Sequence, residues 1–428
     1  MKLLLKGGRV IDPGRGVDET LDILVDQGFI VETGPQIDAT GQEVEVLDVR
    51  GLVVTPGLVD MHVHFREPGF EYKETVRTGS EAACAGGFTA VACMANTNPV
   101  NDHRAVTEFI RRKAAEVDLV HVYPVSAISM NLEGKTLSEF WDQKSAGAVA
   151  FSDDGRTVRD SALMRRALEY AYSLDMPVLC HCEDPYLSAG GVMNEGIVST
   201  GKGLAGIPSI AEDIIVIRDI LLCEFSRTAV HIAHVSTRGA VQAIREAKGR
   251  GVQVTAETAP HYFTLTDEAI GDFDTNAKVY PPLRRPEDVA AVREGLRDGT
   301  IDAIASDHAP HAQTEKEVEF ELAATGLVGL ETSLGLSLRL VADGVLSLSE
   351  LVEKMSLAPA RILKVPGGTL APGSPADITV MAPDRPWRVD RDRLRSRSRN
   401  TPFHGWTLPG RAVLTLRGGR VVYRDILP

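Results

Sequence analysis

From Gly57 onward, short apolar runs alternate with amphipathic stretches along the chain. Eight of the apolar runs have the length and composition of buried strands, and most are separated by segments with helical periodicity. These runs cover residues 58–64, 89–95, 120–127, 148–151, 178–181, 229–234, 252–256 and 302–306. Strands and helices that alternate in this number predict an α/β fold, a closed (β/α)8 barrel of the TIM type.

The clearest helical period lies in residues 159–173, where Leu163, Ala167, Leu168 and Tyr172 recur on one face. Residues 211–225 and 286–297 follow a similar pattern, and the second of these begins with a proline, which suits the first turn of a helix. We therefore expect these three segments to be helices on the outside of the barrel.

The two ends of the chain differ from its middle. Residues 1–55 and 366–428 are rich in short strand patterns and glycine-containing turns. Residues 4–11 and 416–422 even share a similar Gly-Gly-Arg-Val piece. We expect both termini to build one small β-sandwich domain, while residues 56–365 form the barrel.

Composition and charge restrict the function. With 428 residues, 43% hydrophobic and 25% charged, the chain suits a globular protein of two or three domains. A formal net charge of -13 argues against nucleic acid or an anionic membrane as a partner. Neither a secretory signal nor an apolar run of roughly 20 residues is evident. Because the five cysteines are few and scattered, we expect a reduced, cytoplasmic protein with no disulfide framework.

His62 and His64 stand at the end of the first apolar run, separated by one valine. Side chains two residues apart on a strand point to the same side, so both imidazoles are expected to converge on one spot. Two convergent imidazole nitrogens suit a divalent transition metal such as zinc.

Histidine or aspartate also stands at the end of four other runs. Because the carboxyl ends of parallel barrel strands meet on one face, these groups are expected to converge with the histidine pair. Such a set suits two metal ions bridged by a carboxylate. The residues in question are Asp153 and Asp154, His181, His234, and Asp307 with His308.

Two further histidines are expected to be outside the ligand set. His231 lies three residues before His234 on the same run, so strand alternation places it on the opposite side. His261, which follows the seventh run, is expected to orient a ligand or the substrate loop without binding metal.

Sequence motifs relate the chain to a known family. Residues 56–69, with Met-His-Val-His-Phe-Arg at their centre, resemble the first signature of the dihydroorotases, and residues 305–311 resemble the second. The likeness extends through residues 94–99, 151–155, 181–183, 234–236, 280–284 and 329–332. The chain is thus identified as a member of the amidohydrolase superfamily, similar to the bacterial type I dihydroorotases. The resemblance implies zinc-dependent, reversible hydrolysis of (S)-dihydroorotate to N-carbamoyl-L-aspartate in pyrimidine biosynthesis.

The same resemblance implies a metal-ligand set with two zinc ions per subunit. His62 and His64 would hold one ion together with Asp307, and His181 and His234 would hold the other. Asp154 would bridge the two ions, with its neighbour Asp153 as the rival assignment. Asp307 would also be the catalytic residue that carries a proton.

The substrate-binding residues follow from the resemblance in the same way. Arg66 and Asn96 would bind the substrate carboxylate, with His311 assisting, and His64 would also contact the substrate. A planar guanidinium matches a carboxylate through two parallel hydrogen bonds, which suits Arg66. The remaining substrate contacts would come from Tyr280, Thr325 and Gly326.

Two positions depart from the family pattern. Tyr280 stands where the family usually has asparagine, and Thr325 stands where phenylalanine usually precedes Gly326. Both departures fall at substrate contacts, so they bear on affinity or substrate choice more than on the metal chemistry.

Two other functions compete with this interpretation. Hydantoinases and allantoinases bridge their metals with a carboxylated lysine at the end of strand four, but residues 147–152 contain none, and Lys144 lies at the wrong end. A non-catalytic scaffold for aspartate transcarbamoylase would be expected to lose metal ligands, which this chain keeps. An active enzyme could still form a complex with that transcarbamoylase, and a homodimer is the expected assembly.

Overall fold

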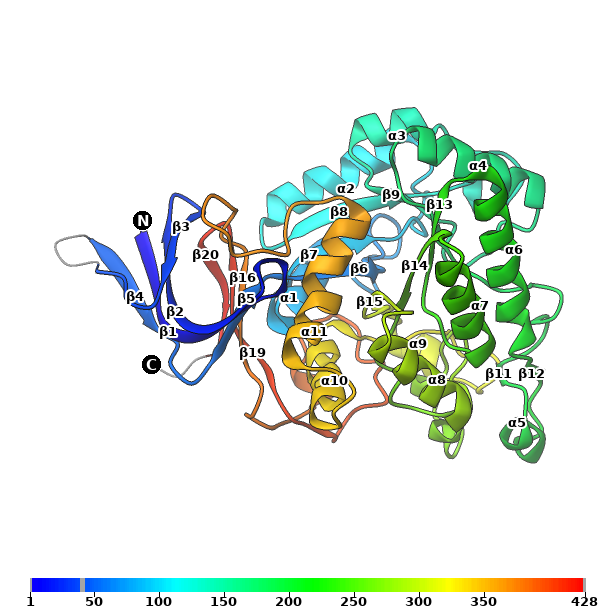
Figure 1. Ribbon diagram of the computed structural model, residues 1–428. Helices are drawn as coiled ribbons and strands as arrows, with labels where there is room; N and C mark the ends of the chain where they lie inside the picture. The colour runs from blue at the N-terminus through cyan, green and yellow to red at the C-terminus, as the bar shows by residue number, and fades with distance from the viewer. Residues whose placement is uncertain (1, 39–42, 426–428) are drawn as a thin grey trace.

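The computed structural model describes residues 2–38 and 43–425 and shows a barrel joined to a β-sheet built from both ends of the chain (Figure 1). Eight parallel strands form the barrel wall in two hydrogen-bonded groups. Bridges between Phe151 and Val178, and between Val63 and His308, join the groups and close the barrel. The strands are β6 (Leu58–Val63), β7 (Phe88–Cys93), β8 (His121–Ser126), β9 (Ala150–Phe151), β10 (Leu179–Cys180), β13 (Ala229–Ile232), β14 (Gln253–Thr258) and β15 (Ala303–Ile304).

The predicted (β/α)8 barrel is therefore confirmed, and each predicted run overlaps one barrel strand. Strand β7 begins one residue before its run, and β14 ends two residues after its run. Most of the strands are shorter than their apolar runs. The runs around β9, β10 and β15 keep only two residues each in regular strand geometry.

Helices surround the barrel strands (Figure 1). The three predicted helices are present as α4 (Ser161–Ser173), α6 (Ile210–Ser226) and α8 (Pro286–Arg297). The first of them begins two residues later than predicted because Asp160 caps it, accepting hydrogen bonds from the backbone N–H groups of Ala162 and Leu163. The other principal helices are α1 (Val76–Gly86), α2 (Arg104–Val117), α3 (Phe140–Ala146), α7 (Arg238–Gly249), α10 (Leu330–Ala342), α11 (Leu348–Val352) and α12 (Ala358–Leu363).

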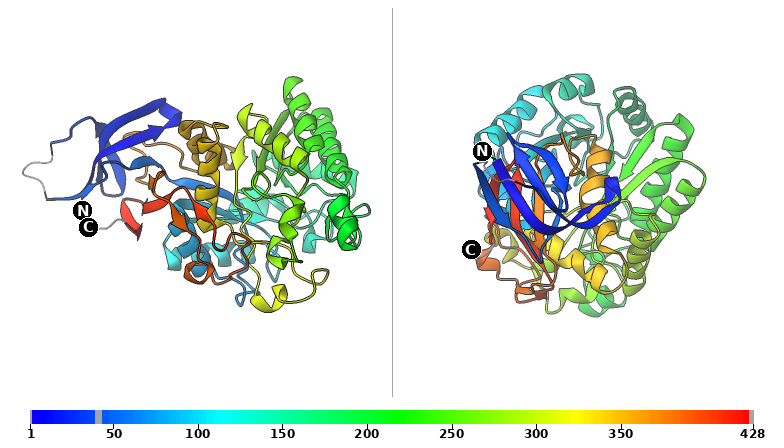
Figure 2. Two further views of the ribbon diagram at one scale, coloured as in Figure 1. Left: turned by 90° about the horizontal axis from the view of Figure 1, so that it is seen from below. Right: turned by 60° about the vertical axis from the view of Figure 1, so that its left-hand side comes forward.

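Strands from both termini form one mixed sheet of eight strands at the other end of the molecule. Figure 2 shows the blue N-terminal and red C-terminal strands side by side. Apolar side chains from both ends, among them Leu5, Ile23, Ile378 and Leu414, share one buried core. The strands are β1 (Lys2–Asp12), β2 (Val17–Asp26), β3 (Phe29–Gly34), β4 (Val44–Asp48), β5 (Val53–Pro56), β16 (Ile378–Ala382), β19 (Arg411–Arg417) and β20 (Arg420–Arg424).

Strand β5 connects the sheet to the barrel. It pairs with β1 on one side and with β16 on the other, and after Gly57 the chain continues directly into β6. The first barrel strand is thus tied to the terminal sheet through a single residue at its start, the end opposite to His62.

Residues between β16 and β19 return to the barrel. Strands β17 (Trp387–Arg388) and β18 (Thr407–Leu408) pair with each other and are not part of the terminal sheet. Val389 and Phe403 pack in one apolar cluster with Tyr262, which follows barrel strand β14. This C-terminal segment therefore contacts the loops near the candidate site, and the domain boundaries at residues 55 and 366 remain predictions.

Candidate metal centre

Five strand ends of the barrel bring the predicted metal ligands together. His62 lies in β6 and His64 directly after it, whereas Asp154 follows β9 by three residues. His181 follows β10 directly, His234 comes two residues after β13, and Asp307 three residues after β15. All six side chains are buried. The site depends on barrel closure, because its residues come from strands that are far apart in the sequence. The backbone N–H of Ser306, for example, donates to the carboxylate of Asp60, which lies 246 positions earlier in the chain.

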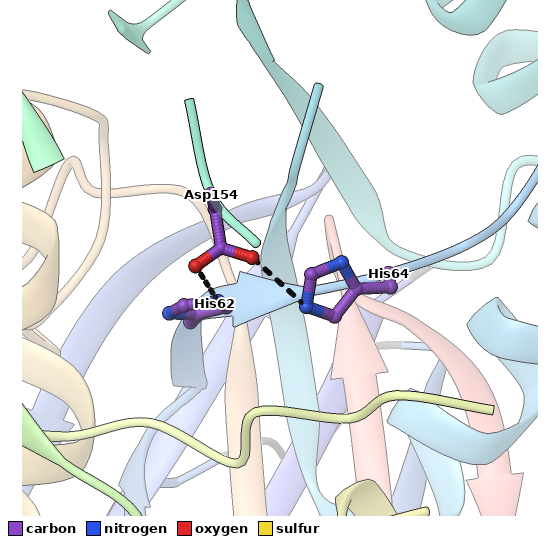
Figure 3. A group of neighbouring side chains, drawn as sticks. All are labelled: His62, His64 and Asp154. Atoms are coloured by element: carbon purple, nitrogen blue, oxygen red, sulfur yellow. Dashed lines mark ion pairs between the residues drawn. The ribbon is translucent and has the colours of Figure 1, made fainter. Parts of the chain in front are cut away.

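His62, His64 and Asp154 form a first group with the spacing of a metal site. The Nε2 atom of His62 lies 3.3 Å from Oδ1 of Asp154, and Nε2 of His64 lies 3.4 Å from Oδ2 of the same carboxylate. Figure 3 shows the carboxylate between the two imidazoles, with one oxygen toward each ring. The two histidines therefore converge, as their spacing on the strand predicts.

Asp154 also belongs to a second group, with His181 and His234. Its Oδ1 atom lies 3.4 Å from Nδ1 of His181 and 3.3 Å from Nε2 of His234. The two imidazole nitrogens are 2.8 Å apart. One carboxylate thus serves both groups, which is the arrangement that a pair of bridged cations requires.

Asp307 borders the first group. Its Oδ1 atom lies 3.4 Å from Nε2 of His64 and 3.6 Å from Nε2 of His62. Burial disfavours the charge on this carboxylate, but the two imidazoles outweigh that effect and lower the pKa of Asp307 to about 2. Asp307 is therefore ionised at neutral pH and available to accept a proton or bind a cation.

The donor set fits a divalent cation. The Nε2 atom of His62 is fully buried and makes no hydrogen bond within the described residues. A buried nitrogen without a partner is costly, and a cation between His62 and Asp154 would satisfy it. Burial opposes ionisation of Asp154, but the imidazoles of His62, His181 and His234 hold its pKa well below the ordinary value. Four imidazoles around an ionised carboxylate are a typical zinc environment.

Asp153, the neighbour of Asp154, points elsewhere. Its Oδ1 atom accepts a hydrogen bond of 2.9 Å from the backbone N–H of Ser129, and the Ser129 hydroxyl donates to its other oxygen. It belongs to neither ligand group among the described residues. Its carboxylate is thus used to hold the loop after β8.

His231 and His234 are oriented differently from what strand alternation predicts. His234 has a φ of 37°, so the chain leaves strand geometry after Ile232 and turns this imidazole toward Asp154. His231 nevertheless also faces the barrel interior, where Nε2 lies 3.5 Å from Oε2 of Glu257. The prediction that the two histidines face opposite sides is therefore wrong, because regular alternation ends at Ile232.

Left-handed backbone conformations occur at three residues of the site. Arg66, His234 and Asp307 have φ angles of 62°, 37° and 48°. For residues with a Cβ atom, such conformations cost about 1–3 kcal/mol each and persist only where the surrounding structure holds them. The strain is concentrated where side chains must turn into the site.

The residues predicted to bind substrate lie around the ligand groups. Arg66 donates from Nε to the carbonyl of Pro310 at 3.2 Å, and its Nη2 atom is 3.4 Å from Nε2 of His311. Asn96 Oδ1 lies 2.9 Å from Nδ1 of His64. Burial and the nearby cations lower the pKa of His311 to about 2, so His311 is neutral at physiological pH. Lys73, the other cation next to His311, is paired with Glu315 at 2.8 Å, whereas Arg66 is in no described ion pair.

Tyr280 stands beside the second ligand group. Its ring lies nearly parallel to that of His181, with centroids 5.9 Å apart, and its hydroxyl donates to Oε1 of Glu183. Burial, followed by the charge of Glu183, raises the pKa of Tyr280 above its ordinary value, so the phenol stays protonated. Tyr280, which departs from the family pattern, is thus held by the carboxylate of Glu183, two residues after the predicted ligand His181.

Thr325 and Gly326 hold the loop that carries His311. The carbonyl of Thr325 accepts a hydrogen bond of 2.9 Å from Nε2 of His311. Gly326 has a φ of 135°, and a Cβ atom there would lie 2.6 Å from that of Ala309. This close approach requires glycine.

Two buried residues of the site were not predicted from the sequence. Glu257 contacts His62, with its Oε1 atom 2.7 Å from Nδ1. Its position directly after the seventh predicted run, at a strand end, could have identified it. Asn400 accepts from the N–H of His311 at 3.1 Å and donates to the carbonyls of Ala309 and Gly326 at 3.1 and 3.0 Å. No sequence signal pointed to Asn400, because it lies 74–91 residues from its partners.

Comparisons with known proteins show the family of this chain. Residues 51–240 match the Dihydro-orotase-like family, and residues 225–423 match the Amidohydrolase family. A protein named dihydroorotase from Syntrophus aciditrophicus is 62% identical over 425 residues, which cover 99% of this chain and 100% of the relative. The dihydroorotase of Geobacter metallireducens is 57% identical over 424 residues, with the same coverage.

Solved structures show the same fold. The L-hydantoinase (dihydropyrimidinase) from Arthrobacter aurescens superposes with a TM-score of 0.89 at 26% identity and covers 100% of this chain and 97% of that one. The dihydropyrimidinase from Brevibacillus agri has a TM-score of 0.85 at 24% identity, covering 99% of this chain and 95% of that chain.

Replacing Asn400 with alanine should loosen the loop that carries His311. The substitution removes three buried hydrogen bonds, and each unpaired group left behind costs about 1–3 kcal/mol. Hydrogen–deuterium exchange followed by mass spectrometry should show faster exchange in residues 309–327. Asn276→Ala is the matched control, since the Asn276 side chain donates only within its own exposed turn. Unchanged exchange in residues 309–327 of the Asn400 variant would contradict this role.

Proposed function

The chain belongs to the dihydroorotases, the amidohydrolases that interconvert dihydroorotate and N-carbamoyl-aspartate, and from this premise we propose that it works with two zinc ions held by the residues described above. The observation that carries the proposal is the position of Asp154, which is shared by both ligand groups. His62, His64 and Asp307 are proposed to hold one ion, His181 and His234 the other, and Asp154 to bridge them.

Zinc is proposed because of the donor atoms. The site offers neutral imidazole nitrogens and carboxylate oxygens, and all five described cysteines are free and buried away from the two groups. Two divalent ions in these groups would supply the Lewis acidity that activates a water and polarises a carbonyl near neutral pH.

Arg66 is proposed to bind the carboxylate of dihydroorotate. Its side chain is nine-tenths buried and is not in any described ion pair. Its contacts with the Pro310 carbonyl and with His311 hold the guanidinium on the side of the site next to His64. A buried guanidinium without a carboxylate partner strongly favours an anionic ligand. Asn96 and the neutral His311 would complete the carboxylate site, and Tyr280, Thr325 and Gly326 would border it.

Asp307 is proposed to move the proton during hydrolysis. As an ionised carboxylate next to His62 and His64, it can accept the proton of the attacking water at one oxygen. It then delivers that proton to the ring nitrogen as the amide C–N bond breaks, which yields the carbamoyl group and a free carboxylate. In the biosynthetic direction the same residue would take the proton from the carbamoyl nitrogen as the ring closes.

A hydantoinase or allantoinase activity is the competing function, because the solved structures with the same fold include hydantoinases. In this chain Asp154 occupies the shared position between the ligand groups. Lys144 lies in α3, where its Nζ atom donates to the carbonyl of Leu174. No lysine is therefore placed to bridge the two groups within the described residues, which favours dihydroorotate.

The assembly and location of the enzyme are part of the same proposal. We propose a homodimer in the cytoplasm that is able to form a complex with aspartate transcarbamoylase. The free state of the five cysteines supports a reduced compartment. Within the described residues, none of the helices has both the length and the apolar character that crossing a membrane requires. A complete ligand set argues against a purely structural role in such a complex.

Zinc-loaded protein should hydrolyse dihydroorotate in preference to hydantoin and allantoin. The reaction can be followed by the ultraviolet absorbance of dihydroorotate, with the two other cyclic amides as comparison substrates. A chelator should abolish turnover, and added zinc should restore it. Absence of dihydroorotate turnover by protein that carries two zinc ions would refute the proposed function.

Replacing Asp154 with asparagine should reduce bound zinc from two ions to one or fewer, because a neutral amide cannot bridge two cations. Asp153→Asn is the matched control, since Asp153 contacts Ser129 and neither ligand group. The metal content of each purified variant, measured by mass spectrometry of the elements, decides between the two aspartates. If Asp153→Asn loses zinc and Asp154→Asn keeps it, the assignment of the bridging residue is wrong.

Replacing Arg66 with lysine should raise KM for dihydroorotate by about tenfold, or about 1.4 kcal/mol, because lysine keeps the charge but loses the planar fork. The zinc content should stay unchanged. Steady-state kinetics measure the effect, and Arg166→Lys is the control, because the Arg166 side chain is 70% exposed on α4. A KM equal to that of the unaltered enzyme would show that Arg66 does not bind the carboxylate.

A further inference from the structure

A buried carboxylate lies behind His62, on the side of the ring that faces away from Asp154. Glu257 is in β14, and its Oε1 atom is 2.7 Å from Nδ1 of His62. The other ring nitrogen of His62, Nε2, faces Asp154. His62 and Glu257 are both almost completely buried. The imidazole is therefore held between two carboxylates with different functions.

His231 and Thr255 extend this contact further into the barrel. Nε2 of His231 lies 3.5 Å from Oε2 of Glu257, and its Nδ1 atom is 2.8 Å from the hydroxyl of Thr255. His231 and Thr255 are direct partners in the ladder between β13 and β14. Thr255 and Glu257 are two residues apart on β14, so both point to the same side.

The chemistry of these groups determines where the protons lie. Oε1 of Glu257 lies 2.7 Å from Nδ1 of His62. Because a carboxylate accepts hydrogen bonds, a proton on Nδ1 of His62 satisfies this contact and leaves Nε2 for a cation. At the other end, the Thr255 hydroxyl is 2.8 Å from Nδ1 of His231. If this hydroxyl donates to Nδ1, the proton of His231 lies on Nε2, toward Glu257.

His62, Glu257, His231 and Thr255 thus form a row of contacts across the barrel interior. Three buried atoms of this row have no hydrogen-bond partner in the described part of the chain. They are Nε2 of His62, Oε2 of Glu257 and Nε2 of His231. The last two face each other, 3.5 Å apart. The first lies 3.3 Å from Oδ1 of Asp154, at the place where a cation would be bound.

We propose that Glu257, oriented by His231, is a positioning residue that fixes His62 in its Nδ1–H form and thereby sets the zinc affinity of the group formed by His62, His64 and Asp154. This inference rests on the proposed metal centre and adds residues that do not touch the metal. A carboxylate behind a histidine ligand holds the ring in one orientation and makes its free nitrogen a stronger donor.

Glu257→Gln is the decisive variant. Glutamine has nearly the same size, but its oxygen is a weaker acceptor, and its NH2 group would face the N–H of His231. Zinc affinity, measured by competition between the protein and a chelating dye, should fall by about 10- to 100-fold. At saturating zinc the KM for dihydroorotate should be unchanged, because Glu257 does not reach the substrate side of His62.

His231→Gln provides a second, independent measurement. It leaves the bond between His62 and Glu257 in place, so its zinc affinity should fall by less than that of Glu257→Gln. The double variant should bind zinc no more weakly than Glu257→Gln alone, since His231 acts only through Glu257. A general loss of packing would instead make the two effects additive.

Asp22→Asn is the matched control. Asp22 is a buried carboxylate in the terminal sheet, where it accepts from the N–H groups of Gly7 and Ile37. This variant should melt at a lower temperature with unchanged zinc affinity, which separates stability from metal binding.

Unchanged zinc affinity of a folded Glu257→Gln protein would overturn the inference. Additive losses in the double variant would overturn the part assigned to His231. If Glu257→Gln does not fold, His231→Gln decides the matter, and an affinity equal to that of the unaltered protein counts against the proposal. Unaltered protein that binds no zinc would refute the proposed metal centre as well, so the two failures are distinguishable.

Discussion

The hydrogen bond from the backbone N–H of His64 to the carbonyl of His308, 2.9 Å long, joins the first strand of the barrel to the last. Together with the bridge between Val63 and His308, it closes the ring of strands. Asp307 precedes His308, so the same contact brings this carboxylate within 3.4–3.6 Å of the two histidines of the first strand. In an open sheet the first and last strands would be farthest apart. Barrel closure is thus the constraint on which the metal centre depends.

In the closed barrel, the burial of charged groups at the site is energetically costly. Four imidazoles and two carboxylates are buried within a few ångströms, and burial disfavours every charge among them. The structure offsets this cost by pairing Asp154 with imidazoles on both sides and by placing Glu257 behind His62. Left-handed backbone at His234 and Asp307 turns these side chains inward. A centre of this kind is held together by its surroundings and would gain further stability from bound cations.

The two ends of the chain support the site from opposite directions. Strand β5, which belongs to the terminal sheet, leads through Gly57 into the strand that carries His62. From the other end, Asn400 fastens the backbone of His311 and Gly326. Replacing the usual asparagine by Tyr280 has a local consequence, because the phenol stacks beside His181 and bonds to Glu183. The loop that carries His311 is therefore held by residues that are far apart in the chain.

The sequence by itself determined the barrel, the helix positions and the candidate ligands, because hydrophobic period and strand-end placement are local properties of the chain. The helix predicted at residues 286–297 agrees with α8 at both ends, and the pair His62 and His64 converges as its spacing requires. Tertiary structure alone decided which aspartate is shared, since Asp153 and Asp154 differ only in the direction that the loop after β9 gives them. It also turned His231 inward and brought Glu257 and Asn400 to the site. These contacts join residues of separate strands and loops, and their geometry is fixed only when the barrel closes.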